Sequence, residues 1–239
     1  MPLAADIEAS LASVRRRIDT AAHRSHRSPS DITLVAVSKT FSAEHVRAAA
    51  AAGQMVFGEN RVQEGADKAQ QLAGLEIEWH LIGHLQSNKA KRAVASFKWI
   101  ESVDSLDLLH RIDRAAVEEH ARPQILIQVD LAHETTKHGA DQAQVTELVD
   151  AALNATSIDL RGLMIVPPIP DRAEDSRPWF RQLRELRDRL VYGGVPAERL
   201  SHLSMGMSHD FEVAIEEGAT IVRVGSSIFG GRPAPAPSM

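Results

Sequence analysis

The hydrophobic and polar positions along this chain alternate between two periodicities. Short apolar runs rich in β-branched residues predict buried strands, and between them lie longer segments with apolar positions three or four residues apart, which is typical of amphipathic helices. The predicted strands span 32–37, 55–57, 78–82, 97–100, 124–129, 158–166, 200–203 and 220–224. The predicted helices span 4–23, 43–52, 62–72, 87–94, 105–119, 141–153, 179–190 and 210–217.

This strict alternation predicts parallel strands joined by right-handed crossovers. An open doubly wound sheet and a closed (β/α)8 TIM barrel both fit it. Eight units in 239 residues match the usual size of the barrel, whereas an open sheet normally has a glycine-rich turn after its first strand. The turn here, SKTFSAEH, contains no glycine. We therefore predict a single-domain α/β barrel over 1–232 and a flexible proline-rich tail over 233–239. The N-terminal helix would complete the outer ring, because no helix is expected after the eighth strand.

Composition and charge narrow the function classes. The formal net charge of −5 argues against a nucleic-acid partner bound by phosphate neutralisation. The chain has no cysteine, which excludes disulfides, thiolate catalysis and cysteine metal sites. No apolar run is long enough to span a membrane, and the N-terminus lacks the apolar core of a signal peptide. We expect a cytoplasmic monomer with no bound metal and no membrane partner.

Candidate chemistry lies at the carboxyl ends of the predicted strands, where barrel enzymes carry their sites. Lys39 ends the first strand in LVAVSKTF, Asn60 follows the second strand, and His84 follows the third. Lys137, in the loop after the fifth strand, is a candidate second amine. Each has an ordinary alternative, namely a solvated strand end, a polar loop residue or a hydrogen-bonded structural histidine.

The last two loops of the barrel predict a phosphate site. Loops after strands seven and eight frequently bind phosphate in this fold, and here they read SMGMSHD and RVGSS. Glycine lets backbone N–H groups approach an anion, and the hydroxyls of Ser208 and Ser226 add donors beside Gly225. The helix after Ser208 would also point its positive end at the anion. The ordinary alternatives are an N-cap and a turn.

Arg223 lies inside the apolar strand TIVRV, and an arginine is seldom buried without a partner. An amine from Lys39, a guanidinium and a phosphate cradle at one end of one barrel match the needs of pyridoxal 5′-phosphate. A lysine beside an apolar interior is a good nucleophile because its neutral form is favoured. We therefore predict that pyridoxal 5′-phosphate is the cofactor.

Several stretches resemble the YggS/PROSC family of pyridoxal phosphate homeostasis proteins. They are LVAVSKT, FGENRVQE, WHLIGHLQSNK, TTKHG, GLM and LSMGMSHDFEVAIEEGATIVRVGSSIFG, and together they cover nearly the whole predicted barrel. The resemblance implies a barrel like the N-terminal domain of alanine racemase, with pyridoxal phosphate held as a lysine Schiff base. It also implies a role in storing or buffering this vitamin B6 cofactor, or in delivering it to apo forms of pyridoxal-phosphate enzymes.

The resemblance also implies the cofactor-binding residues by position: Lys39, Asn60, Ser204, Ser208, Arg223, Gly225 and Ser226. Lys39 would carry the cofactor, Arg223 would face the pyridine nitrogen and Asn60 would lie near the ring. The three serines and the glycine would hold or adjoin the phosphate. This chain departs from the family in two loops: Phe41-Ser42 stands where a Lys-Pro is common, and DLAHETTKHG is an unusual loop before Gly139.

Three functions remain open at this point: a cofactor-binding homeostasis protein, an amino-acid racemase or related pyridoxal-phosphate enzyme, and a phosphosugar enzyme using Lys39 without a cofactor. The third would have only Glu59 and Asp130 as carboxylates at strand ends and leaves Arg223 unexplained. A racemase of this barrel type needs a tyrosine as second base and a second domain. The only tyrosine, Tyr192, ends a predicted outer helix. We favour the homeostasis protein and expect no robust catalysis.

Overall fold

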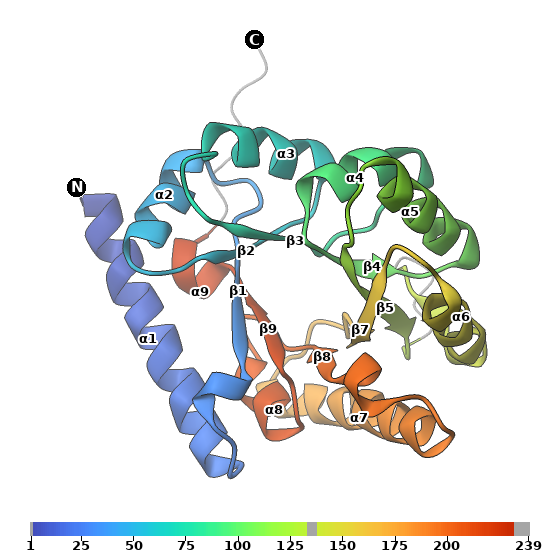
Figure 1. Cartoon of the computed structure of the whole chain (residues 1–239). Coiled ribbons are helices and arrows are strands. Elements are labelled where there is room, and N and C mark those ends of the chain that lie inside the picture. Colours follow the sequence, from blue (N-terminus) through green and yellow to red (C-terminus); the bar gives the residue numbers. More distant parts are fainter. Residues whose placement is uncertain (1, 133–137, 232–239) are drawn as a thin grey trace.

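The protein folds into a closed parallel barrel surrounded by helices, as the computed structural model of residues 2–132 and 138–231 shows (Figure 1). Nine strands pair in the order β4-β3-β2-β1-β9-β8-β7-β5-β6, and β4 also pairs with β5, which closes the ring and leaves β6 (Ala140–Asp141) attached outside it. The barrel strands are β1 (Thr33–Val37), β2 (Val56–Glu59), β3 (Glu78–Leu81), β4 (Trp99–Val103), β5 (Gln124–Asp130), β7 (Asp159–Met164), β8 (His202–Ser204) and β9 (Ile221–Val224). The predicted TIM barrel is confirmed and the open sheet is excluded.

Helices form the outer ring, and α1 stands between the last and first units (Figure 1). The α-helices are α1 (Pro2–Arg24), α2 (Ala43–Ala51), α3 (Val62–Gln71), α4 (Ala90–Ser96), α5 (Leu106–Glu118), α6 (Gln142–Asn154), α7 (Arg177–Tyr192), α8 (Phe211–Glu216) and α9 (Ser226–Phe229). The 3-10 turns are η1 (Pro29–Asp31), η2 (Ser87–Lys89), η3 (Ala173–Ser176) and η4 (Ala197–Leu200). Because α1 packs against α2, α8 and α9, it completes the ring as predicted. The expectation of no helix after the last strand is wrong, since the four-residue α9 follows β9.

The strands are apolar on both faces because each is buried on both. One face packs on the helices, and the other fills the barrel interior, where a separate cluster is formed by Val35, Trp99, Leu126, Met164 and Ile221. Burial on both sides removes the simple alternation that a half-exposed strand would show. This explains why the strands read as short continuous apolar runs.

Helix α7 buries the residues that the helical periodicity places inward, namely Phe180, Leu183, Leu186 and Leu190. Its last residue, Tyr192, is 97% exposed, so the predicted place of Tyr192 on the outer ring is confirmed. Helix α6 begins with a capping box, in which the Gln144 side chain accepts a hydrogen bond from the backbone N–H of Asp141.

No helix within the described residues is long and apolar enough to cross a membrane. The proline-rich tail over 233–239 lies outside the described residues, so the predicted boundary at 232 remains a prediction.

Candidate functional site

A cavity of about 330 Å³ opens at the carboxyl end of the barrel strands. Six of the predicted cofactor-binding residues line it: Lys39, Asn60, Ser208, Arg223, Gly225 and Ser226. Apolar side chains of Val37, Ile82 and Val166 complete much of the inner wall. The structure thus brings together residues from the first, second, seventh and eighth units. Lys137 lies outside the described residues.

The loops after β8 and β9 meet at Ser208. Its Oγ accepts hydrogen bonds from the backbone N–H groups of Gly225 (3.2 Å) and Ser227 (3.4 Å). The Ser227 hydroxyl donates in return to the Ser208 carbonyl oxygen (3.4 Å). Gly225 directly precedes α9, so the first N–H groups of that helix lie at this wall of the cavity. The hydroxyls of Ser208 and Ser226 belong to the same wall. Such a group of donors can hold an oxyanion.

Asp210 orders the loop that carries Ser208. This carboxylate is buried, and its Oδ1 accepts a hydrogen bond from the backbone N–H of Met207 (2.7 Å). Its Oδ2 accepts from the hydroxyl of Ser176 (2.7 Å). Asp210, and not Ser208, therefore stands at the N-cap position of α8. The prediction overlooked this role, although an aspartate directly before a helix is a known sequence signal for a cap.

Arg223 is only 4% exposed, yet it reaches the cavity wall. Its Nη1 donates to the hydroxyl of Ser204 (2.5 Å), and its Nη2 donates to the carbonyl oxygen of Ile165 (2.7 Å). Burial lowers the pKa of the guanidinium, while the carboxylates of Glu101 and Asp210 act in the opposite direction. Ser204 is fully buried and does not line the cavity. It supports Arg223 from inside the barrel, and this position differs from the one expected beside the phosphate.

A chain of polar side chains continues from Ser204 through the barrel interior. The Ser204 hydroxyl donates to Glu101, whose other oxygen is 2.6 Å from Nδ1 of His80. Nε2 of His80 is in turn 3.3 Å from Oε1 of Glu78. Burial alone would lower the pKa of His80, but the bonds to Glu101 and Glu78 raise it above its ordinary value. Burial would raise the pKa of Glu101, but His80 and Arg223 lower it.

The buried carboxylate of Glu101 balances the guanidinium at the cavity, because Glu101 lies between His80 and the Ser204 hydroxyl that Arg223 bonds. The prediction missed Glu101 and His80. The same sequence pattern that identified Arg223 could have identified them, because each is a single ionisable residue inside an apolar strand. Glu101 lies in WIESV and His80 lies in WHLIG.

Both neighbours of Lys39 are tied to α3 and β2. Thr40 has a φ of +69°, in the left-handed region that non-glycine residues rarely occupy, and its N–H donates to Glu64 (2.6 Å). The hydroxyl of Ser38 donates to the buried Glu59 (2.6 Å). The backbone that presents Lys39 is therefore held on each side by a carboxylate.

Lys68 joins these two carboxylates. Its buried amine donates to Glu59 (2.7 Å), to Glu64 (2.8 Å) and to the carbonyl oxygen of Ser38 (2.7 Å). Burial raises the pKa of Glu59, while Lys68 acts to lower it. Glu59 is thus part of an ion cluster between the barrel and α3, and neither it nor Asp130 lines the cavity. This placement disfavours the phosphosugar alternative, for which these were the two candidate carboxylates at strand ends.

Comparison with known proteins identifies the family. A family model described as "Alanine racemase, N-terminal domain" matches residues 9–233. The pyridoxal phosphate homeostasis protein of Aquifex aeolicus is 44% identical over 222 residues, covering 93% of this chain and 96% of the relative. The chain belongs to the family of pyridoxal phosphate homeostasis proteins. The Escherichia coli K12 member is 41% identical over 233 residues, covering 95% of this chain and 97% of that protein. The family resemblance found in the sequence is confirmed.

Solved structures agree with this assignment. PipY of Synechococcus elongatus PCC7942 without pyridoxal phosphate superposes with a TM-score of 0.84 at 41% identity, covering 94% of this chain and all (100%) of PipY. The same protein with pyridoxal phosphate bound gives a TM-score of 0.83 at 40% identity. Alanine racemase of Clostridium difficile 630 gives a TM-score of 0.74 at 16% identity, over 96% of this chain and 58% of the racemase, which shows a shared fold.

Proposed function

We propose that this chain binds pyridoxal 5′-phosphate in the cavity at the carboxyl end of the barrel and serves cofactor homeostasis. The observation that carries the proposal is the convergence of Lys39, Arg223 and the Ser208–Gly225–Ser226 wall on one cavity. PipY has been solved with pyridoxal phosphate bound, which supports the choice of ligand. The curated relatives are named for pyridoxal phosphate homeostasis, which supports the role.

Lys39 supplies the amine. Lys39 would hold the cofactor through this amine, and the cofactor, when bound, would supply the aldehyde with which a primary amine reacts reversibly, with loss of water. Lys39 lines the cavity, and the bonds from Ser38 and Thr40 to Glu59 and Glu64 fix its backbone. Its side chain thus starts from a turn after β1 whose backbone is held on both sides.

The wall around Ser208 holds the phosphate. The hydroxyls of Ser208 and Ser226 can donate to its oxygens. The backbone N–H groups of Gly225 and Ser227 can join them by turning to the phosphate from the Ser208 oxygen that they now bond. Hydrogen bonds to an anion are stronger than those between neutral groups, so this wall provides much of the binding selectivity. The ordered loop held by Asp210 keeps the donors in place.

Arg223 faces the ring nitrogen. A cation at this position disfavours protonation of that nitrogen, because two adjacent positive charges repel. A neutral pyridine ring withdraws electrons weakly, which suits storage and transfer better than carbanion chemistry. Glu101 and Ser204 hold the guanidinium in the orientation that permits this contact.

We also propose that the protein acts in the cytoplasm as a monomer and delivers the cofactor to apo enzymes. The net charge of −5 supports a monomer. Within the described residues the large exposed apolar side chains are few, namely Leu75, Val117, Ile169 and Tyr192, whereas stable oligomers bury broad apolar patches.

Borohydride reduction of the cofactor-loaded protein, followed by peptide mapping, tests the proposal. We expect the label on the peptide containing Lys39, and Lys39→Ala should abolish it without changing the far-UV circular dichroism. Lys89→Ala is the matched control, since Lys89 lies in the turn η2 and does not line the cavity. Recovery of the label mainly on Lys89, Lys91 or Lys98 would refute the assignment of Lys39.

A further inference from the structure

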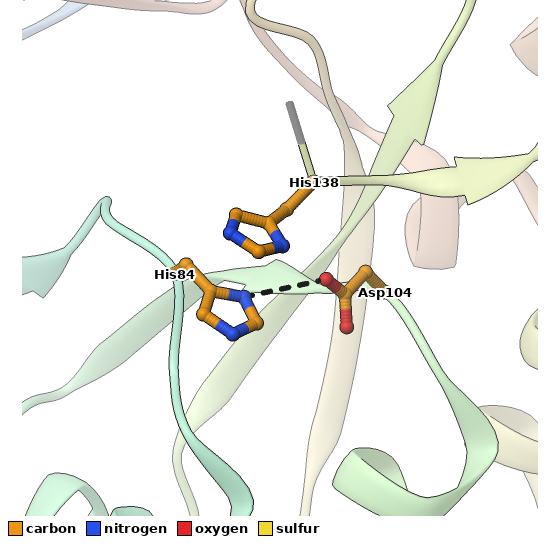
Figure 2. Close-up of side chains that lie close together, drawn as sticks. All are labelled: His84, Asp104 and His138. Atoms are coloured by element: carbon orange, nitrogen blue, oxygen red, sulfur yellow. Dashed lines mark ion pairs between the residues drawn. The ribbon is translucent and has the colours of Figure 1, made fainter. Parts of the chain in front are cut away.

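A second cluster of potential ligands lies at the carboxyl end of the barrel, apart from the cavity. Figure 2 shows His84, Asp104 and His138 with their polar atoms turned toward one another. Nδ1 of His84 is 3.5 Å from Oδ2 of Asp104, and the two imidazole rings stack with centroids 3.6 Å apart and an interplanar angle of 11°. One ligand atom from each residue lies within 4.8 Å of the others. None of the three lines the cavity described above.

The three side chains lie near the carboxyl ends of three neighbouring strands. His84 follows β3, Asp104 directly follows β4, and His138 precedes β6, which pairs with the end of β5. β3 pairs with β4 and β4 with β5, all in parallel. Their carboxyl ends therefore lie side by side, and each contributes one nitrogen or oxygen donor to the same point.

The backbone at both histidines is fixed by buried neighbours. Ser102 donates a hydrogen bond to the carbonyl oxygen of Gly83 (2.7 Å), next to His84. Any Cβ at Gly83 would collide with the carbonyl oxygen of Asn60, so only glycine permits this close approach. The carbonyl oxygen of His138 accepts from the buried Gln128 (2.5 Å). The loops are thus held while the imidazoles remain open to solvent.

We propose that His84, Asp104 and His138 form a binding site for a divalent first-row transition metal, with Zn²⁺ as its representative ion. Two imidazole nitrogens and one carboxylate oxygen are a donor set that Zn²⁺ uses at open sites, where water takes the fourth position. Tetrahedral ligands about 2.0–2.1 Å from Zn²⁺ are about 3.4 Å apart. The three ligand atoms already lie within 4.8 Å of one another, so rotation of the two exposed imidazoles about their side-chain bonds would bring them to this spacing.

The proposed site is independent of the cofactor, although the two are neighbours through Gly83 and Asn60. Bound metal would link the backbone at His84, Asp104 and His138 at this edge of the barrel. The proposed metal site differs from the expectation, drawn from the sequence, that the protein binds no metal. The sequence does not indicate that His84, Asp104 and His138 lie close together.

Calorimetric titration of the untagged full chain with ZnCl₂ tests the site. We expect one equivalent to bind, and His84→Ala and His138→Ala each to weaken binding more than about tenfold, since even loss of an outer-shell partner costs 10–100-fold. Asp104→Asn should weaken it as well. His110→Ala is the matched control, because His110 is an exposed histidine on α5 outside the cluster, and it should bind as the wild type does.

Two further measurements separate the site from other sources of zinc binding. The titration is repeated with and without pyridoxal phosphate, because the cofactor itself chelates metals. Thermal unfolding without metal should be the same in all variants, and ZnCl₂ should raise the melting temperature of the wild type and of His110→Ala only. Binding that is equal in the wild type and in the His84→Ala/His138→Ala double variant would overturn the proposal. So would binding that requires the cofactor.

Discussion

The amine of Lys68 lies 2.7 Å from the carbonyl oxygen of Ser38, the residue directly before Lys39. The same amine bonds Glu59 and Glu64, which hold Ser38 and the left-handed Thr40. A buried ion cluster beneath the barrel rim therefore holds the backbone on both sides of Lys39, the proposed cofactor lysine. Lys68 supports the site without lining it.

Replacing Lys68 should destabilise the protein and slow cofactor attachment. Lys68→Met leaves Glu59 as an uncompensated buried charge, which costs ~3–5 kcal/mol of unfolding free energy at neutral pH. Urea denaturation followed by circular dichroism measures the loss, and borohydride trapping measures attachment to Lys39. The control is Lys91→Met, whose amine forms ion pairs at the exposed surface and should change neither quantity. Equal losses in both variants would contradict a special role for the cluster.

The pair formed by His80 and Glu101 should make stability depend on pH. The folded-state pKa of His80 is raised, so its contribution is fully present below about pH 6.5 and is lost as the pH rises through the folded value. The pKa of Glu101 is lowered, so its contribution is present above about pH 4.3 and is lost as the pH falls through the folded value. Stabilisation by the pair is therefore greatest between these limits.

Unfolding free energies measured by denaturant at a series of pH values test this window. His80→Gln should abolish the decline above pH ~6.5 that the wild type shows. His110→Gln, at an exposed position, should retain it. If the free energy of unfolding fell with the same slope above pH ~6.5 in the wild type and in His80→Gln, the pair of His80 and Glu101 would not be its cause.

The wall around Ser208 should bind ligands that carry a negatively charged phosphate in preference to ligands that lack one. Pyridoxal without its phosphate should bind far more weakly than pyridoxal 5′-phosphate, because it cannot use the donors of Gly225 and Ser227. Ser226→Ala removes one hydroxyl and should weaken binding by about fivefold, equivalent to ~1 kcal/mol. Ser226→Asp should weaken it much more, through repulsion of the phosphate. Equilibrium dialysis measures each of these affinities, and equal binding of pyridoxal and pyridoxal 5′-phosphate would refute the position of the phosphate.

The loaded protein should turn over no amino acid at an enzymatic rate. Racemisation needs a base on one face of the substrate and an acid on the other, and Tyr192 is 97% exposed on the outer helix. Incubation with L- and D-alanine in deuterated water should give α-deuteration far slower than about 1 s⁻¹. Tyr192→Phe should leave any slow exchange unchanged. Rapid deuteration with inversion would identify the chain as a racemase.

The fold could be predicted from the sequence because its cause is local. A barrel strand is buried on both faces, so it appears as a short apolar run, and each outer helix shows one apolar stripe. Parallel strands also place their carboxyl ends at one rim, so Lys39, Asn60 and Ser208 could be assigned to one site before their distances were known. The errors concerned short pieces such as α9 and β6, whose four and two residues are too few to show a period.

The supporting contacts were decided only by the tertiary structure. Glu101 and Ser204 are 103 positions apart in the chain, and they meet in the interior because the closed ring leaves only β5 and β7 between β4 and β8. Hydrophobic periodicity reports which face of an element is buried, but not what lies opposite that face. The partner across the interior depends on how the strands are staggered when the ring closes. For the same reason the sequence indicated a buried Arg223 in need of a partner, and only the closed barrel supplied Ser204 and Glu101.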